Sequence, residues 1–158
     1  MHERASEFEE RAENEAGFDV DVHEFPEGTK TAADAAAAIG CDVAQIASSL
    51  VFDAGDDLVV VVTSGANRMS EEKLAELRSL SESEVGMAEA DEIREVVGWS
   101  IGGVPPFCHD SDLPVYLDET LTNFETVWGA AGTPKAVFPI SPEKLRELSG
   151  ATVADVSE

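Results

Sequence analysis

The segment from Trp99 to Asp110, WSIGGVPPFCHD, gathers two glycines, two prolines, a cysteine and a histidine. Adjacent prolines can neither continue a helix nor occupy the middle of a sheet, because proline lacks the N–H donor and clashes with a preceding helical turn. The two glycines before them weaken regular structure further. The segment therefore predicts a loop of fixed shape, and such loops often carry function.

Short helices and strands are expected on both sides of this loop. The expected helices cover residues 4–17, 31–40, 70–80, 90–98 and 141–150. They begin at capping residues Thr31, Ser70, Asp91 and Ser141 and end at Gly17, Gly40, Gly98 and Gly150. Asp42 caps a further short turn. The expected strands cover residues 18–25, 49–53, 58–63, 85–88, 114–119, 125–132 and 136–140.

Strands interleaved irregularly with short helices predict a mixed α/β fold around one sheet. A chain of 158 residues suits a single domain, 1–158, in which residues 1–17 form an N-terminal acidic helix. No internal repeat or linker interrupts it.

The charge of the chain is strongly acidic, with 33 Asp and Glu against 10 Lys and Arg and a formal net charge of −23. The acidic residues are spread along the chain rather than blocked together. Such a surface suits a cytoplasm of multimolar salt, where charges are screened within about 3 Å at 1 M, and it predicts an extreme halophile as the source. A nucleic-acid partner normally requires basic patches, an objection that high salt weakens.

Targeting signals are absent from the sequence. No run approaches the roughly 20 apolar residues of a membrane span, and the first residues lack the basic-then-apolar order of a signal peptide. Cys41 and Cys108 do not form a disulfide framework. We expect a cytoplasmic protein that does not interact with membranes.

Metal and nucleotide motifs are also absent. The spacing of His2, His23 and His109 matches no common metal site, and neither a CxxC nor a phosphate-binding glycine motif occurs. We therefore expect no metal and no cofactor. Cys108 and His109 suggest a thiol–imidazole pair, but neighbouring residues of an extended loop point in opposite directions, so we expect both to be bystanders.

The Gly-Pro loop offers a different chemistry. Gly102 and Gly103 allow backbone N–H groups to converge on an oxygen, because no Cβ blocks the approach. Pro105 and Pro106 would hold that backbone rigid, as an oxyanion hole requires. On spacing alone, an oxyanion hole and a purely structural turn both remain open.

Five segments together resemble a known family. They are TAADAA, AQIASSLVF, LVVVVTSGANRMSEEKL, SIGGVPPF and AAGTPKAVFPISPEKL. Their order and spacing, over residues 20–155, resemble the YbaK/ProX family of aminoacyl-tRNA editing domains. The resemblance implies a mixed α/β domain with a curved central sheet. It also implies hydrolysis of the ester of mischarged tRNA, notably tRNA(Pro) carrying alanine or cysteine. The implied partners are the 3′ end of aminoacyl-tRNA and prolyl-tRNA synthetase.

The GxxxP loop of the family corresponds to Gly102–Pro106. The resemblance implies that Gly102, Gly103 and Val104 hold the aminoacyl carbonyl as it becomes tetrahedral. It further implies that Thr31 and the turn at Ser64 and Gly65 flank the pocket, and we expect His109 and Asp118 at its rim. The expected substrate-binding residues also include Lys30, Arg68, Pro106 and Phe107.

One position departs from the family. Its motif resembles QIVKSLVF, with a lysine needed for activity, whereas this chain has Ser48 in QIASSLVF. A serine supplies a hydroxyl but no positive charge. Losing a charge-assisted hydrogen bond, about 1.5–3 kcal/mol, predicts roughly ten- to 150-fold weaker function. Lys30 or Arg68 could replace the charge from another direction.

The sequence thus leaves three hypotheses. The first is a freestanding aminoacyl-tRNA deacylase, and Ser48 is then one of its catalytic-site residues. The second is a catalytically weakened or inactive module that binds the aminoacyl-tRNA 3′ end. The third, a hydrolase that uses Cys108 as nucleophile, is the least favoured.

Overall fold

The computed structural model describes residues 2–25 and 31–158 and has the predicted mixed α/β fold. The helices are α1 (Glu3–Ala16), α2 (Ala32–Ile39), α3 (Glu71–Leu77), α4 (Ala90–Glu92) and α5 (Pro142–Ser149). Single-turn elements are η1 (Val43–Gln45), η2 (Glu82–Glu84), the π-helical η3 (Ile93–Val97) and η4 (Glu119–Asn123). The strands are β1 (His23–Glu24), β2 (Ile46–Ala54), β3 (Asp57–Ser64), β4 (Val85–Met87), β5 (Val115–Asp118), β6 (Val127–Ala130), β7 (Ala136–Ile140) and β8 (Thr152–Ala154).

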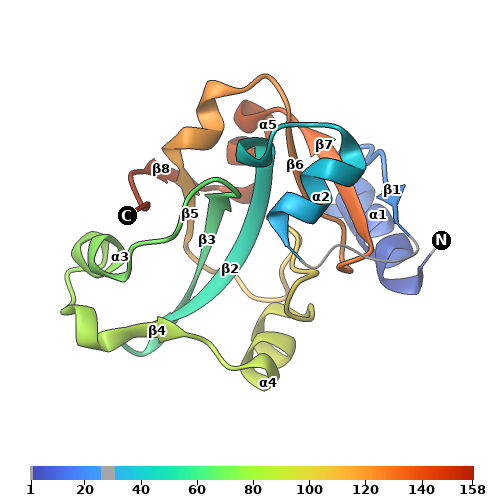
Figure 1. Cartoon of the computed structure of the whole chain (residues 1–158). Helices are drawn as coiled ribbons and strands as arrows, with labels where there is room; N and C mark the ends of the chain where they lie inside the picture. Colours follow the sequence, from blue (N-terminus) through green and yellow to red (C-terminus); the bar gives the residue numbers. More distant parts are fainter. Residues whose placement is uncertain (1, 26–30) are drawn as a thin grey trace.

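All the described strands belong to one curved sheet, with β2 running through its centre (Figure 1). The strand order is β1-β7-β6-β2-β3-β5-β8, and β4 also pairs with β2. The sheet is mixed: β2 is antiparallel to β3 and parallel to β6, and β3 is parallel to β5. This arrangement confirms the single-sheet mixed α/β fold predicted from the sequence and the curved central sheet that the family resemblance implies.

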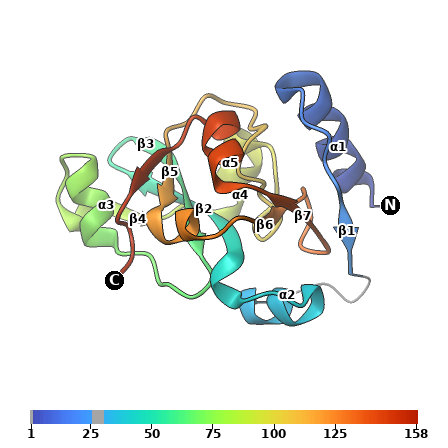
Figure 2. The same ribbon diagram turned by 90° about the horizontal axis from the view of Figure 1, so that it is seen from above.

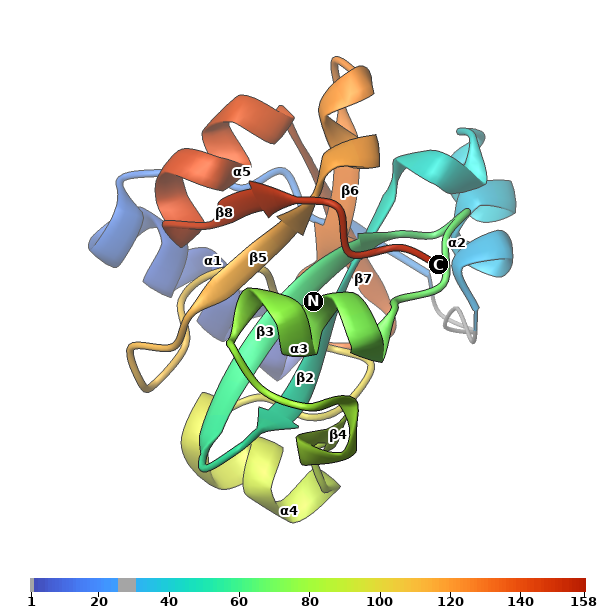
Figure 3. The ribbon, with the colours of Figure 1, turned by 90° about the vertical axis from the view of Figure 1, so that its left-hand side faces the viewer.

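Two apolar layers cover the sheet. One layer contains Phe8 of α1, Leu145 of α5, Phe107 of the Gly-Pro loop and Phe138 of β7. The other contains residues of α3 and the opposite faces of β2 and β3. Accordingly, α1 and α3 lie on opposite sides of the molecule (Figure 2), and α3 crosses in front of β2 and β3 in Figure 3.

The ends of several helices confirm the sequence prediction. The Thr31 hydroxyl accepts a hydrogen bond from the Asp34 N–H, and Gly40 ends α2 at φ 87°. Ser141 caps α5 in the same way, with Pro142 at its first position. Helix ends that are set by an N-cap hydroxyl or by a left-handed glycine depend only on main-chain groups a few residues away, so the sequence predicts them well.

Other boundaries differ from the prediction. The expected strand 18–25 is reduced to His23–Glu24, and α3 ends at Leu77, which is 41% exposed. β2 starts earlier, at Ile46, and β8 was not predicted. The helix expected at 90–98 begins after Glu89 rather than Asp91 and continues as a π-turn to Gly98. No helix in the described ranges is long and apolar enough to cross a membrane.

Candidate active site

A break in the sheet forms the candidate site. β3 pairs with one edge of β2 along Ala47–Ala54. The other edge of β2 pairs with β6 at Ile46 and Ala47 and with β4 from Phe52 to Ala54. On this second edge, between the residues paired with β6 and those paired with β4, residues 48–51 pair with no strand in the described part of the chain. A pocket of about 200 Å³ opens at this break.

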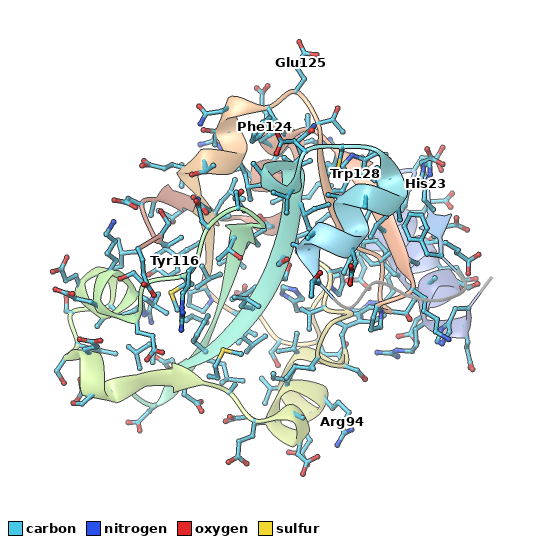
Figure 4. The ribbon with its side chains drawn as sticks, in the orientation of Figure 1. His23, Arg94, Tyr116, Phe124, Glu125 and Trp128 are labelled. Atoms are coloured by element: carbon cyan, nitrogen blue, oxygen red, sulfur yellow. The ribbon has the colours of Figure 1, made fainter. Side chains whose placement is uncertain are left out.

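The walls of the pocket come from six segments. They are the start of α2, the open stretch of β2, residues 87–93, the Gly-Pro loop, β6 and the turn into β7. Lining side chains include Thr31, Ala35, Ser48, Ser49, Met87, Ile93, Ile101, Trp128, Thr133 and Val137. Figure 4 labels Trp128 next to α2 and near His23, and the two rings lie 5.0 Å apart, edge to face. The lining contains no charged residue among those described.

Ser48 and Ser49 bring polar groups to the open edge of β2. Successive residues of a strand face opposite sides of the sheet, so Ser48 lies on the face of Ile46, which packs against α2. Ser49 lies on the face of Ala47 and Val51. The Ser49 hydroxyl is buried and has no hydrogen-bond partner among the described residues.

The main chain of Ser49 points to the same opening. The Ala88 N–H donates to the Val51 carbonyl at 3.1 Å, so the main-chain groups of Val51 face the edge of β2 on which β4 lies. Polar main-chain groups two residues apart in a strand share an edge, so those of Ser49 face the break. Buried polar groups are normally satisfied, so the unpaired Ser49 hydroxyl marks a place on this edge where a polar group of a ligand can bind.

The Gly-Pro loop supplies another wall. Gly102 adopts φ 84°, a left-handed conformation that glycine tolerates without strain. Gly102 and Val104 line the pocket. No hydrogen bond within residues 2–25 and 31–158 occupies their N–H groups. Two main-chain donors without a partner among the described residues thus belong to the wall of the pocket.

Gly103 was expected to hold the aminoacyl carbonyl with its N–H group, but this N–H group is already hydrogen-bonded. Its N–H donates to the Ser100 carbonyl at 3.0 Å and closes a turn, so it is not available to an oxyanion. A Cβ on Gly103 would lie 2.8 Å from the Thr133 Cα. Gly103 thus allows the loop to approach the turn before β7, and the two donors of the site come from its neighbours.

The rest of the loop is core structure. Pro106 and Phe107 are buried, and the Phe107 ring packs against those of Phe8 and Phe138 with centroids 5.5 and 5.8 Å away. Neither residue lines the pocket. They fix the loop from behind instead of contacting a ligand there.

A second group of expected site residues lies at the end of β3 and does not itself line the pocket, although a Cβ on Gly65 would meet the lining residues Ala32 and Ile46. The buried Asp118 carboxylate accepts hydrogen bonds from the N–H groups of Ser64 and Thr120, at 3.1 and 3.0 Å. The Ser64 hydroxyl donates to the Ala44 carbonyl at 2.7 Å. A Cβ on Gly65 would lie 2.5 Å from the Val43 carbonyl oxygen. These contacts hold the turn at the end of β3 together.

The two expected cationic residues are not found at the pocket. Arg68 is exposed and pairs with Glu158 at 3.3 Å, and it does not line the pocket. Lys30 lies outside the described residues. Arg68 therefore does not replace the missing lysine in this conformation.

Cys108 and His109 face a separate cavity of about 320 Å³, on the far side of the loop. Burial raises the pKa of the Cys108 thiol to about 11, which disfavours the thiolate. Burial also lowers the pKa of His109, whose Nε2 lies 2.7 Å from the Pro105 carbonyl. No cluster of metal-ligating side chains occurs in the described part of the chain.

Several lining residues were not singled out by sequence reasoning, among them Ser49, Trp128 and Thr133. Ser49 and Thr133 fall inside the segments AQIASSLVF and AAGTPKAVFPISPEKL, so their neighbourhood was marked although the residues were not. Trp128 carries no local signal, because its place depends on the parallel pairing of Ile46 with Trp128.

Two curated proteins are similar to this chain in sequence. The chain is 34% identical over 134 residues to the uncharacterized protein YwhH of Bacillus subtilis (strain 168), covering 84% of this chain and 83% of that protein. It is 29% identical over 118 residues to the proline–tRNA ligase of Lysinibacillus sphaericus (strain C3-41), covering 73% of this chain but only 20% of the ligase.

A solved structure is similar over the whole chain. It is the crystal structure of a protein proposed as a trans-editing enzyme for prolyl tRNA synthetase, with a TM-score of 0.93 and 39% identity, covering 100% of this chain and 99% of that one. The sequence model of the aminoacyl-tRNA editing domain matches residues 26–148, which include both the open stretch of β2 and the Gly-Pro loop. The chain therefore belongs to the aminoacyl-tRNA editing domain family.

Proposed function

We propose that this protein is a freestanding deacylase that hydrolyses the ester of mischarged tRNA, with alanyl- or cysteinyl-tRNA(Pro) as substrate. The observation that carries the proposal is that Gly102 and Val104, whose N–H groups have no hydrogen-bond partner among the described residues, line the same pocket as the open edge of β2. The partners would be the 3′ end of aminoacyl-tRNA and prolyl-tRNA synthetase.

The chemistry follows from these donors. Water adds to the ester carbonyl, and the carbonyl oxygen becomes an oxyanion that the two N–H groups stabilise. Collapse of this intermediate breaks the bond to the ribose oxygen, which takes up the proton released by the water. A ribose hydroxyl or the substrate amino group could orient the water. Cys108 takes no part, and a Cys108→Ala variant should keep the activity.

The composition of the lining supports a small amino acid. Five alanines and two glycines are among the uncharged residues that line the pocket. Hydrophobic pockets discriminate one methylene by about 1–3 kcal/mol, mostly by excluding what is too large. Alanine- or cysteine-sized groups fit such a sieve better than larger ones.

The neutral mouth supports a nucleoside at the entrance. Met87 and Ile101 are 54% and 50% exposed and both line the pocket. Exposed apolar side chains at a pocket mouth suit the flat face of a terminal adenine. In a chain of net charge −23, an uncharged lining also places no carboxylate where it would repel the phosphates of the tRNA end.

The second candidate, a binding module with weak or no turnover, is favoured by Ser48. This residue stands in the pocket at the position of the family lysine, and no charged side chain among the described lining residues replaces it. The module hypothesis predicts binding of aminoacyl-adenosine without hydrolysis.

The test is deacylation of alanyl-, cysteinyl- and prolyl-tRNA(Pro) in molar KCl, by the natural chain and by Ser48→Lys. The deacylase proposal predicts hydrolysis of the alanyl or cysteinyl ester by the natural chain, and sparing of the prolyl ester. The lysine variant should be faster, by roughly ten- to 150-fold if the added charge reaches the substrate. Turnover by the lysine variant alone would instead establish the binding module.

A further inference from the structure

The N-terminal helix α1 contacts the Gly-Pro loop at both of its ends, although it lies before the segment that matches the editing-domain family. The loop is closed at a neck formed by residues 97–99 and 108–110. There the Asp110 N–H donates to the Val97 carbonyl at 3.0 Å, and the Trp99 indole N–H donates to the Cys108 carbonyl at 2.8 Å.

Two arginines of α1 bind the two segments that form this neck. Arg4 donates a hydrogen bond to the Gly98 carbonyl, in the segment 97–99. Arg11 forms an ion pair with the Asp110 carboxylate at 2.9 Å, in the segment 108–110. The carboxylate of Asp110 itself occupies the space where a Cβ of Gly98 would lie.

Both guanidinium groups also contact the indole ring of Trp99, which lies in the neck. The Cζ atoms of Arg4 and Arg11 lie 4.3 and 5.5 Å from the Trp99 ring centroid. Trp99 is buried, so the attraction between cation and ring is only weakly screened. Phe8, on the same helix, packs edge to face against Trp99 at 6.1 Å.

The contact continues from α1 to the pocket wall. A Cβ on Gly132 would lie 2.7 Å from the Arg4 carbonyl oxygen and 2.8 Å from the Trp99 ring. The neighbouring Thr133 backbone lies against Gly103, between the two N–H donors of the pocket. Packed contacts of this kind transmit displacement, because interiors have few voids.

We propose that Arg4 and Arg11 are positioning residues, which hold the neck of the Gly-Pro loop and thereby fix the N–H groups of Gly102 and Val104. The catalytic consequence of this role rests on the proposed deacylase function, but the mechanical part does not. An oxyanion hole works only when its donors are preorganised, so loosening the neck should slow the chemical step more than substrate binding.

The first measurement is amide hydrogen exchange, followed by NMR, in the full chain and in the double variant Arg4→Gln/Arg11→Gln. The Gly103 and Asp110 N–H groups are the probes, since both are hydrogen-bonded within the loop. Their exchange should become roughly tenfold faster, because local opening is governed by the contacts that close the segment. The Ala88 N–H, which is bonded to Val51, serves as the internal reference and should not change.

Two further variants separate positioning from general stability. Arg78→Gln removes an arginine that bonds Tyr116 at 3.3 Å and Asp57 at 3.4 Å, far from the loop, and should leave Gly103 and Asp110 as in the natural chain. Arg11→Lys keeps a charge for Asp110 but loses the planar group, and should restore part of the protection. If the double variant does not fold, Arg11→Gln alone gives the same comparison, since it removes one ion pair whose partner, the Asp110 side chain, is 53% exposed.

Single-turnover deacylation then tests the catalytic consequence. The rate constant should fall about tenfold in the double variant while KM changes less than about twofold. Unchanged exchange at Gly103 and Asp110, or an equal rise at Ala88, would overturn the positioning role. Absence of hydrolysis by the natural chain would reject the proposed function while the exchange result stands by itself.

Discussion

Ser49 combines, at the scale of one residue, a buried hydroxyl without a partner and main-chain groups at an unpaired strand edge. A buried hydroxyl without a hydrogen-bond partner costs free energy of folding. Such a cost is retained where the group binds a ligand, as functional sites often trade stability for binding. The unpaired hydroxyl therefore distinguishes Ser49 from a residue that merely fills space.

Ser49→Ala should raise the free energy of unfolding by about 1 kcal/mol, because it removes an unpaired polar atom from the interior. The same change should weaken binding of a non-hydrolysable alanyl-adenosine analogue by roughly tenfold. Chemical denaturation and titration calorimetry measure the two effects. Ser83→Ala, at an exposed position, is the control and should alter neither. A loss of stability in Ser49→Ala would contradict the assignment.

The buried imidazole of His109 gives the loop a pH dependence. Burial lowers its pKa, whereas the unfolded chain protonates a histidine at about pH 6.5. Between these two values the unfolded state binds more protons, so the free energy of unfolding falls as the pH is lowered through this window and is fully present above it.

Denaturant unfolding at several pH values checks this expectation, with His109→Gln as the comparison. The variant should lose stability less steeply than the natural chain below about pH 6.5. Parallel curves for the two proteins would show that the imidazole is not responsible.

At the scale of elements, the approach of the Gly-Pro loop to the turn before β7 depends on Gly103. Gly103→Ala would place a Cβ 2.8 Å from the Thr133 Cα, a backbone atom that cannot move aside alone. We expect the variant to lose about 1–3 kcal/mol of unfolding free energy and most deacylation. Gly86→Ala, where a Cβ meets nothing within 4 Å, is the matched control and should differ little from the natural chain. Equal stability of the two variants in denaturant would contradict this packing.

The sequence predicts an element well where contacts between neighbouring residues determine its ends, and poorly where pairing with a distant strand does. Thr31, Ser141 and Gly150 define helix ends through contacts with the next few residues, so those ends were predictable. β8 joins the sheet only by parallel pairing with β5, and β2 extends to Ile46 only because β6 lies beside it. Such long-range pairing leaves no local pattern.

The candidate site shows the same division. The resemblance marked Gly102, Val104, Thr31 and Ser48, which the fold brings to one pocket. It also marked Ser64 and Asp118, whose hydrogen bonds instead hold a turn at the end of β3. The sequence motifs do not show that the edge of β2 is open at Ser49, because the opening results from the long-range pairing of β4 and β6 with separate parts of β2.

At the scale of the whole molecule, the net charge of −23 is the dominant property. Like charges destabilise the compact state at low ionic strength, and salt screens them within about 3 Å at 1 M. We expect the thermal midpoint of unfolding to rise steeply between low and molar KCl, as a halophilic source predicts. Calorimetry at a series of KCl concentrations, with sucrose as a non-ionic control, measures it. A midpoint independent of salt would contradict the halophilic interpretation.

The most direct measurement of the central claim is NMR titration of the full chain, in molar KCl, with an alanyl-adenosine analogue whose ester is replaced by an amide. Our account predicts that the backbone amides of Ser49, Gly102 and Val104 and the Trp128 indole shift together, whereas Cys108 and His109 do not. Shifts confined to the cavity beside Cys108, or to the turn at Ser64, would contradict the placement of the editing site at the break in the sheet.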